Sequence, residues 1–208
     1  MRTNKYWGKF IAIEGIDGAG KTTAIKRALP HLGAERDVVY LKGIGSYNPL
    51  GKLAKRFCAT FLFLVELLYV TYFPLRRAMK RGQVVLMDKY FFFTASHVPD
   101  VDTVLNRFLL WACGPLMMRP DIVIYFVVER KERIRRLKFG PYNRYHQRLI
   151  DNPDWILERE TAYIGMIENT GGIELAFLNN TRLDETESAL VFQTVVELFL
   201  KRGPRHES

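Results

Sequence analysis

Residues 10–23 read FIAIEGIDGAGKTT, and this stretch decides which fold the sequence predicts. Its apolar start, Phe10 to Glu14, is typical of a short buried β-strand. Gly15 to Thr22 then fits the pattern G-x-x-x-x-G-K-[ST], and Lys21 to Leu32 is expected to form a helix. A glycine-rich loop between a strand and a helix is the setting in which this pattern binds phosphate. The sequence therefore predicts a phosphate-binding loop over residues 15–22, called the phosphate loop below.

The residues of the phosphate loop suit a nucleoside triphosphate. Glycines allow the backbone to approach phosphate closely, and the amides at a helix N-terminus provide a positive field for the anion. We expect Lys21 to reach the outer phosphates and the hydroxyl of Thr22 to bind Mg²⁺. The predicted ATP-binding residues in this region are Gly15, Ile16, Asp17, Gly18, Ala19, Gly20, Lys21, Thr22 and Thr23.

The rest of the chain alternates short β-like runs with longer helical stretches. Further strands are expected at Val38–Leu41, Val84–Met87, Ile122–Val128 and Glu174–Leu178. Helices are expected at Gly51–Lys80 (in two pieces), Asp102–Met117, Glu129–Lys138, Trp155–Asn169 and Asp184–Lys201. The continuously apolar strands favour a parallel sheet covered on both faces. We therefore predict one α/β domain over residues 1–208, a three-layer fold with a mostly parallel five-stranded sheet.

A second acidic position stands where the third predicted strand ends. Apolar residues from Val84 to Met87 lead directly to Asp88. Ligands of open α/β sheets bind at the carboxyl ends of the strands, so Asp88 is a candidate Mg²⁺ ligand. The alternative is an aspartate that only caps the following turn. Beside Asp88, Lys89 is placed to meet a phosphate and Tyr90 to line the pocket.

The charge of the chain predicts an anionic partner. The 208 residues carry 31 Lys and Arg against 22 Asp and Glu, a net charge of +9. Much of the excess lies between Lys131 and Arg148, where Glu132 is the only acidic residue. The positive residues of this segment are Lys131, Arg133, Arg135, Arg136, Lys138, Arg144 and Arg148.

Other sequence features exclude several classes of protein. Cys58 and Cys113 make neither a metal-ligand spacing nor a disulfide framework. The polar start, Met1 to Lys9, does not resemble a signal peptide. The most apolar run, Phe57 to Phe73, is slightly short for a membrane span and contains Glu66. We therefore expect a cytoplasmic protein that does not enter a membrane.

Several stretches resemble the thymidylate kinase family of P-loop nucleoside monophosphate kinases. The wording Glu-Gly-x-Asp-Gly-x-Gly-Lys-Thr-Thr in residues 14–23 is more specific than a bare phosphate loop. Residues 82–90 (GQVVLMDKY) resemble the strand that ends in Asp-Arg-Tyr in the family, with Lys89 in place of arginine. Weaker matches are the Pro-Asp entry to the fourth strand at residues 120–125, a lid helix at Arg133, Ile134 and Arg136, and an adenine-binding loop at residues 178–180.

The resemblance implies transfer of the γ-phosphoryl group of ATP to a nucleoside monophosphate, dTMP to dTDP in the first place, with Mg²⁺. Lys21 would stabilise charge on the moving group, while Thr22 and Asp88 would serve the metal. Asp17 would face a sugar hydroxyl of the acceptor, and Lys89 would hold its phosphate. Family members with glycine at the position of Gly18 carry catalytic arginines in a lid, here about residues 137–150. The implied catalytic set is Lys21, Asp17, Lys89, Arg136 and Arg144; Arg133 and Asn180 join the ATP site, and Tyr90 the acceptor site. Phe61 or Phe63 is a further candidate for the acceptor site, by stacking on the base, with packing in the core as the alternative role.

The departures from the family fall on the acceptor side. Leu41–Gly45 (LKGIG) stands where the family has Arg-Glu-Pro-Gly-Gly, and Glu66–Tyr69 (ELLY) lacks the helix arginine that reaches the acceptor. Ser96–Val98 (SHV) replaces the family's Ala-Tyr-Gln, although His97 is itself a possible ligand contact. The sequence therefore supports ATP as the donor more firmly than it supports thymidylate as the acceptor.

Two other functions fit part of the sequence. A (deoxy)nucleoside kinase shares the fold and the phosphate loop, but Asp88-Lys89-Tyr90 is not the Asp/Glu-Arg-Ser that such enzymes carry. A P-loop regulatory or nucleic-acid-binding module without kinase activity would use the basic segment, in which Phe139, Tyr142 and Tyr145 interleave the charges.

We expect nucleotides rather than nucleic acid as partners. The expected helix is apolar nearly all round from Thr60 to Phe73, and such a helix needs burial on more than one side. We therefore expect a homodimer through the apolar helix around residues 57–80, with burial inside the monomer as the alternative.

Overall fold

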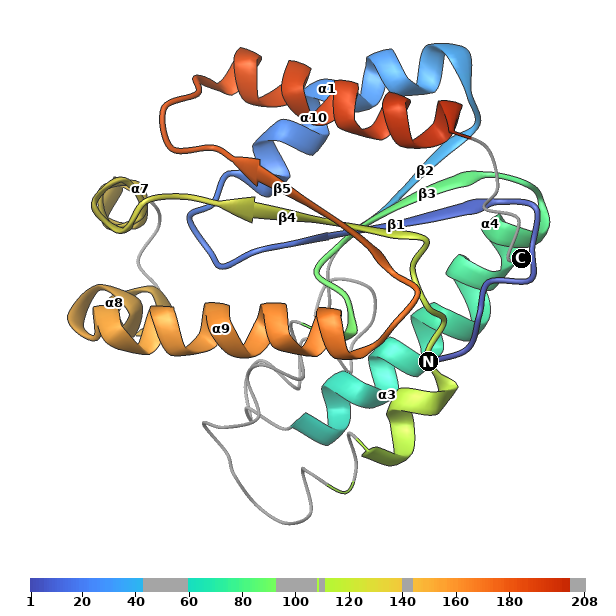
Figure 1. Cartoon of the computed structure of the whole chain (residues 1–208), viewed down its shortest axis with the longest axis horizontal. Helices are drawn as coiled ribbons and strands as arrows, with labels where there is room; N and C mark the ends of the chain where they lie inside the picture. Colours follow the sequence, from blue (N-terminus) through green and yellow to red (C-terminus); the bar gives the residue numbers. More distant parts are fainter. Residues whose placement is uncertain (43–59, 93–107, 109–110, 140–143, 203–208) are drawn as a thin grey trace.

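The computed structural model describes residues 1–42, 60–92, 108, 111–139 and 144–202. Within them, five strands form one all-parallel sheet in the order β2-β3-β1-β4-β5 (Figure 1). The strands are β1 (Lys9–Glu14), β2 (Val38–Leu41), β3 (Val84–Asp88), β4 (Ile122–Val127) and β5 (Glu174–Asn179). Each lies within one residue of its expected bounds, and the predicted α/β fold is confirmed.

Helices cover both faces of this sheet (Figure 1). On one face, α1 (Lys21–Glu35) packs beside α10 (Glu185–Lys201). The other face carries α9 (Pro153–Asn169) together with α3 (Thr60–Val70) and α4 (Arg76–Lys80). At the edge where the strands end lie α7 (Arg130–Phe139) and α8 (Arg144–Asp151).

Two expected helices are only partly covered by the described residues, and their described parts are not regular α-helix throughout. The stretch expected over 51–80 is described from Thr60, where α3 passes into a π-helical turn, Thr71–Leu75, before α4. This turn contains Pro74, whose missing amide and bulky ring disfavour a regular α-helix there. Most of the helix expected over 102–117 lies outside the described residues; its end is helical at 111–113 and becomes a 3₁₀ turn at Gly114–Leu116.

Alternate residues of the strands point into two hydrophobic cores. In β1, Phe10 and Ala12 face the core shared with α3, α4 and α9, whereas Ile11 and Ile13 face the core shared with α1 and α10. All four side chains are fully buried. Burial on both faces explains why the strand sequences are continuously apolar rather than alternating.

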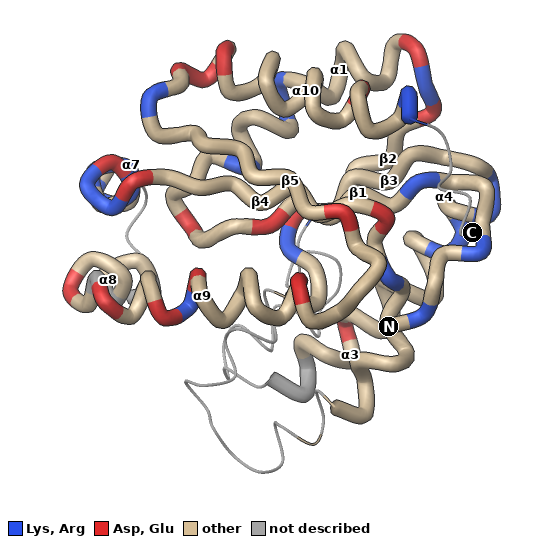
Figure 2. Tube along the Cα trace, viewed as in Figure 1, with Lys and Arg blue, Asp and Glu red and all other residues tan. Residues whose placement is uncertain are grey.

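Two parts of the structure are rich in Lys and Arg. Lys and Arg are frequent along α7 and around α4 (Figure 2).

No helix among the described residues is long and apolar enough to cross a membrane.

Candidate active site

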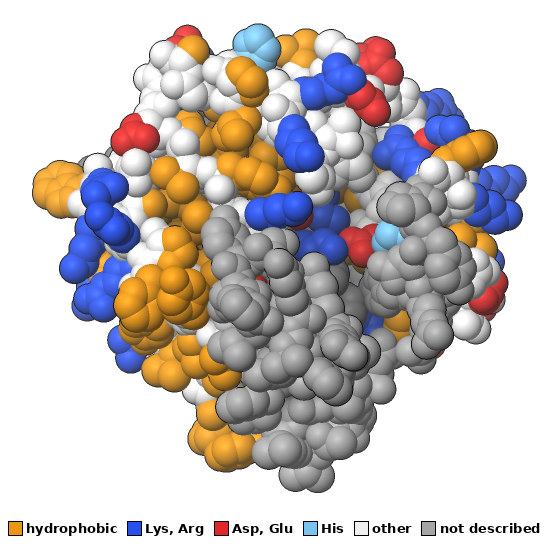
Figure 3. All heavy atoms as spheres, turned by 180° about the vertical axis from the view of Figure 1, so that it is seen from behind, with side chains coloured by type: hydrophobic (Ala, Val, Ile, Leu, Met, Phe, Trp, Pro, Cys, Tyr) orange, Lys and Arg blue, Asp and Glu red, His pale blue; other side chains and the backbone are white. Residues whose placement is uncertain are grey.

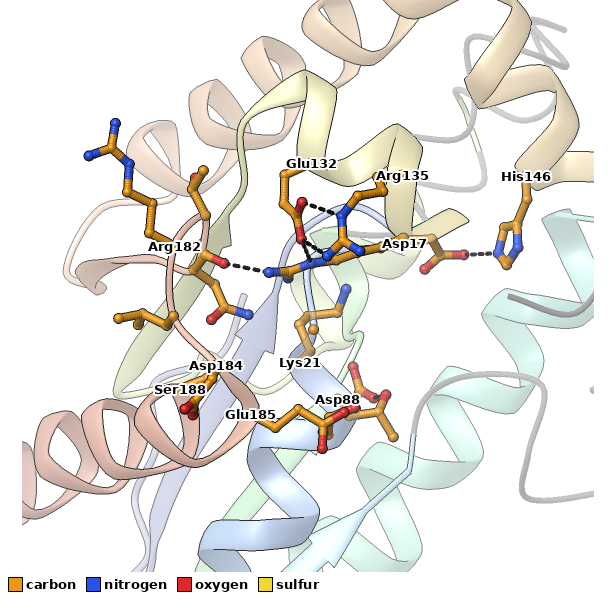
Figure 4. Close-up of a pocket in the computed structure, with 18 of the residues that line it drawn as sticks. Asp17, Lys21, Asp88, Glu132, Arg135, His146, Arg182, Asp184, Glu185 and Ser188 are labelled. Atoms are coloured by element: carbon orange, nitrogen blue, oxygen red, sulfur yellow. Dashed lines mark hydrogen bonds and ion pairs between the residues drawn. The ribbon is translucent and has the colours of Figure 1, made fainter. Parts of the chain in front are cut away.

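A cavity of about 1260 Å³ opens at the carboxyl ends of the strands (Figure 4). Its walls come from the phosphate loop, the end of β3, helix α7, the start of α8 and the segment that joins β5 to α10. Residues predicted from distant parts of the sequence meet here: Asp17, Gly18, Gly20, Lys21, Thr22, Thr23, Asp88, Lys89, Arg136 and Asn180 all line the cavity. Ile16 and Ala19 are buried, and neither lines the cavity.

The phosphate loop has a backbone that requires glycine. Gly15, Gly18 and Gly20 have φ angles of 129°, 85° and 88°, in the left-handed region that strains other residues. A Cβ atom on Gly20 would lie 2.4 Å from Nδ2 of Asn180. Glycine at these positions therefore allows both the loop backbone and its close approach to Asn180, which follows β5.

The side chain of Lys21 is folded into the phosphate loop. It is only 4% exposed, and its ammonium group donates to the carbonyl oxygens of Gly15 and, at 3.2 Å, of Ile16. Burial and the nearby charge of Lys89 lower the pKa of Lys21. Its ammonium group is therefore held among loop atoms, from which it can turn to a phosphate oxygen.

Thr22 and Asp88 form a pair of oxygen ligands beside Lys21. The Thr22 hydroxyl donates to Oδ2 of Asp88 at 2.9 Å, and the hydroxyl of Tyr40 lies 3.4 Å from the same oxygen. Asp88 is 4% exposed, and its other oxygen, Oδ1, is buried with no hydrogen-bond partner among the described residues. Buried polar atoms are normally satisfied, and Mg²⁺ prefers oxygen ligands. The pair therefore fits a divalent cation.

Behind this pair, Glu14 holds the turn that follows β3. Its fully buried carboxylate accepts from the Tyr90 amide at 2.8 Å and from the Tyr163 hydroxyl at 2.6 Å. Burial raises the pKa of Glu14 to about 7, although both hydrogen bonds act in the opposite direction. Glu14 thus ties β1, the end of β3 and α9 together at the base of the site.

The turn held by Glu14 places Lys89 in an uncommon backbone conformation. Its φ angle is 61°, in the left-handed region, and its amide donates to the Ile13 carbonyl at 3.0 Å. Such conformations cost energy for residues other than glycine and concentrate at functional sites. The side chain of Lys89 lines the cavity, while that of the next residue, Tyr90, is fully buried.

Asp17 forms an ion pair with Lys89 and also faces His146 (Figure 4). Its Oδ1 lies 2.6 Å from Nζ of Lys89, and its Oδ2 lies 3.4 Å from Nε2 of His146 in α8. Burial alone would raise the pKa of Asp17, but Lys89 and His146 hold it well below its ordinary value. Burial likewise opposes the charge on Lys89, yet Asp17 raises the pKa of that lysine. Asp17 and Lys89 are therefore a stable charged pair.

Two cations of α7, Arg135 and Arg136, are held by Glu132. Arg135 forms two hydrogen bonds of 2.7 Å with Glu132, and Arg136 forms one of the same length. These hydrogen bonds lower the pKa of Glu132 to about 2. Arg136 also donates to the Asn180 carbonyl at 2.8 Å, and the Asn180 side chain donates to the Ala19 carbonyl at 2.8 Å. Arg136 and Asn180 thus connect α7, β5 and the phosphate loop.

Besides Gly15, Ile16 and Ala19, three further residues predicted to contact nucleotide do not line the cavity. Arg133 is 2% exposed and lies under the phosphate loop, where it donates to the Val128 carbonyl at 2.8 Å and pairs with Glu160. It faces inward because it shares that face of α7 with the buried Leu137. Tyr90, predicted to line the acceptor pocket, lies in the core, with its hydroxyl 3.3 Å from that of Thr71. Phe63 is half-buried on α3, away from the lining of this cavity.

Other expectations lie outside the described part of the structure. They concern the side chain of Arg144, the position of His97 and the segment 43–59. Sequence reasoning missed Glu14 and His146 as site residues. Two signals pointed to Glu14: it is a carboxylate at the end of an apolar strand, and it begins the family-like wording of residues 14–23. His146 lay within the basic aromatic stretch already identified.

Comparison with known proteins assigns the family. The sequence profile of the thymidylate kinase family matches residues 13–152. The chain belongs to the thymidylate kinase family. This confirms the resemblance carried by residues 14–23 and 82–90, and the predicted class of nucleoside monophosphate kinases. Membership of the thymidylate kinase family implies ATP-dependent phosphorylation of dTMP to dTDP.

Individual members of the thymidylate kinase family are distant in sequence. A thymidylate kinase from Ligilactobacillus salivarius is 26% identical over 188 residues, covering 78% of this chain and 85% of the relative. A probable thymidylate kinase from Sulfurisphaera tokodaii is 30% identical over 135 residues, covering 62% and 69%. The solved structure of thymidylate kinase from Candida albicans matches with a TM-score of 0.71 at 15% identity and covers 94% of both chains, which shows a shared fold.

Proposed function

We propose that the cavity transfers the γ-phosphoryl group of ATP to dTMP and releases ADP and dTDP. The observation that carries the proposal is the presence of two charged centres in one cavity: Lys21 with the Thr22–Asp88 pair, and the Asp17–Lys89 pair. A donor phosphate chain on the first and an acceptor phosphate on the second would bring the reacting groups together. Catalysis of this reaction consists mostly of such positioning and of charge stabilisation.

For the donor, the amides of the phosphate loop and Lys21 bind the phosphates, with Lys21 exchanging its loop carbonyls for phosphate oxygens. Asn180 contacts the phosphate loop at the Ala19 carbonyl, and Arg136 contacts the Asn180 carbonyl. These contacts support a role for both residues in orienting ATP, in addition to the charge stabilisation by Arg136 that the sequence predicts. Arg144 at the start of α8 remains the proposed second lid arginine, within a lid over residues 137–150 of a single kinase domain.

For the acceptor, Lys89 binds the phosphate and Asp17 accepts a hydrogen bond from a sugar hydroxyl. The ammonium group of Lys89 is already oriented by Asp17 at 2.6 Å, so the pair is in place before the acceptor arrives. One oxygen of the acceptor phosphate attacks the γ-phosphorus as the bond to the β-phosphate oxygen breaks. Phe63 remains the proposed contact for the base.

Magnesium is the proposed cofactor at the Thr22–Asp88 pair. The ion supplies charge neutralisation to the donor phosphates when bound. Asp88→Asn removes the only negative charge of this pair while keeping the shape of the side chain, so the variant should need a higher Mg²⁺ concentration for half-maximal rate. An unchanged Mg²⁺ dependence would contradict this role of Asp88.

The function is tested by comparing two lysines of α1. In Lys21→Ala the ammonium group of the phosphate loop is lost, whereas Lys26→Ala removes an exposed charge outside the cavity. We expect ADP release with dTMP to fall by roughly a hundredfold or more in the first variant, as for loss of a transition-state charge contact. The second variant should keep the rate of the unaltered chain. Full activity of Lys21→Ala would refute the assignment of the phosphate loop.

We also propose that the chain forms a homodimer through the face that carries α3. Tyr69 and Phe73 are 46% and 62% exposed with rings stacked 5.0 Å apart, and Trp111 is 74% exposed beside Phe108. Hydrophobic side chains gather at lower left in the back view of Figure 3. Exposed apolar clusters of this kind are typical of interfaces.

Sedimentation would decide the dimer proposal. The unaltered chain should sediment as a dimer, and Phe73→Glu as a monomer that keeps its melting temperature. Leu190→Glu places the same charge on an exposed residue of α10 and should remain dimeric. A monomeric unaltered chain at micromolar concentrations would refute the proposal.

A further inference from the structure

The carboxylate of Asp17 is held from both sides by groups of different elements. Lys89, which follows β3, pairs with Oδ1, and His146 of α8 faces Oδ2 at 3.4 Å. All three side chains line the cavity, and each is at most one quarter exposed. We propose that His146 is a positioning residue for the acceptor: it fixes the second oxygen of Asp17 and so orients the carboxylate toward the acceptor sugar. This role rests on the proposed function.

The position of His146 is set by packing against the phosphate loop itself. Leu149, three residues along α8, is fully buried in a small apolar cluster with Ile16, Leu137 and Ile156. Residues three apart on a helix share a face, so His146 projects on the side of α8 that packs here. Ile16 directly precedes Asp17. The cluster therefore fixes α8 relative to the very loop that carries Asp17.

Hydrogen-bond chemistry explains what the contact does. A carboxylate has two acceptor oxygens, and a single cation at Oδ1 leaves the plane of the group free to turn. A donor at Oδ2 removes that freedom, and the remaining lone pairs keep one orientation toward the cavity. The contact needs a proton on Nε2 of His146, which both the charged ring and one neutral tautomer provide. His146 acts through Asp17 and does not itself reach the reacting atoms.

The proposal predicts a kinetic effect confined to the acceptor. His146→Ala should raise KM for dTMP by about tenfold, which corresponds to the loss of one hydrogen bond to a charged group. Its kcat and its KM for ATP should stay within about twofold of the values of the unaltered chain. His146→Gln keeps an N–H donor and should recover most of the affinity. Gln147→Ala is the matched control, because the adjacent Gln147 is exposed, bonds Asp151 on its own helix and does not line the cavity.

A second variant tests whether His146 acts through Asp17. In an Asp17→Asn background, removal of the imidazole should have no further effect on KM for dTMP, because coupled residues are not additive. Equal losses in both backgrounds would overturn the proposal. So would an unchanged KM for dTMP in His146→Ala, or a parallel fall of kcat, ATP affinity and melting temperature, which would mark a merely structural residue.

The outcome for the unaltered chain separates this inference from the proposed function. If the unaltered chain phosphorylates dTMP and the His146 variants behave like it, only the role of His146 is refuted. If the unaltered chain phosphorylates no monophosphate, the proposed function is refuted and the role of His146 falls with it.

Discussion

The buried carboxyl group of Glu14 should make the protein less stable as the pH rises from acid to neutral. Its pKa is about 7 in the folded chain against an ordinary value of 4.5. Between these values the folded protein keeps a proton that the unfolded chain has released, so the free energy of unfolding falls with rising pH. The stabilisation is complete below about pH 4.5 and is lost as the pH passes through 7. The difference of about 2.5 pKa units corresponds to roughly 3 kcal/mol.

Glu14→Gln removes this titration while keeping the size of the side chain. Urea unfolding followed by circular dichroism at pH 5 to pH 8 gives the free energy of unfolding of both proteins. The stability of the variant relative to the unaltered chain should rise by roughly 2–3 kcal/mol across this range. The Tyr163 hydroxyl favours the charged form of Glu14, so Tyr163→Phe should enlarge the pH dependence of an otherwise unaltered chain.

The control for Glu14 is Glu158→Gln on α9, whose side chain is exposed. Its stability relative to the unaltered chain should not vary with pH by more than a few tenths of a kcal/mol. If Glu14→Gln shows the same flat profile as this control, the reasoning from burial is refuted.

Three further variants test the core, a helix cap and the phosphate loop. Phe192→Ala deletes a fully buried ring of α10 and should cost about 3–5 kcal/mol in urea unfolding; a loss below 1 kcal/mol would contradict its place in the core. Asp184→Ala removes the side chain that caps α10 through two backbone amides and should lower the unfolding free energy by about 1 kcal/mol, measured in the same way. Gly20→Ala brings a Cβ atom to 2.4 Å from Asn180 at a φ of 88° and should abolish ATP binding in equilibrium dialysis, whereas Gly33→Ala, with open space around it, should bind normally.

Local patterns in the sequence were sufficient for the strands and the phosphate loop. The strand runs are apolar because both sheet faces are buried, so their ends are marked by the first polar residue, as at Asp88. The phosphate loop depends on backbone conformations that glycine alone adopts readily, and its spacing is therefore visible in one short stretch. Because Asp88 is the first polar residue after the apolar run of β3, it was expected at the carboxyl edge of the sheet. The structure has it there, beside Thr22.

Contacts between distant segments could not be predicted from the sequence. Arg133 belongs to a basic run that suggested a phosphate contact, but its partner Glu160 lies 27 residues further on, in another helix. Tyr90 follows Lys89 directly, yet the left-handed turn at Lys89 sends the two side chains to different environments. His146 reaches Asp17 only because α8 packs against the phosphate loop. Such pairings depend on helix packing, which periodicity alone does not determine.

The identity of the acceptor tests the account most directly. The unaltered chain is incubated with ATP, Mg²⁺ and, in separate reactions, dTMP, dUMP, UMP, CMP, AMP, GMP and free nucleosides, and the phosphorylated products are separated by chromatography. We predict dTDP as the principal product, formed with an equal amount of ADP. Phosphorylation of thymidine alone would indicate a nucleoside kinase, and the absence of product from every monophosphate would contradict the proposed function.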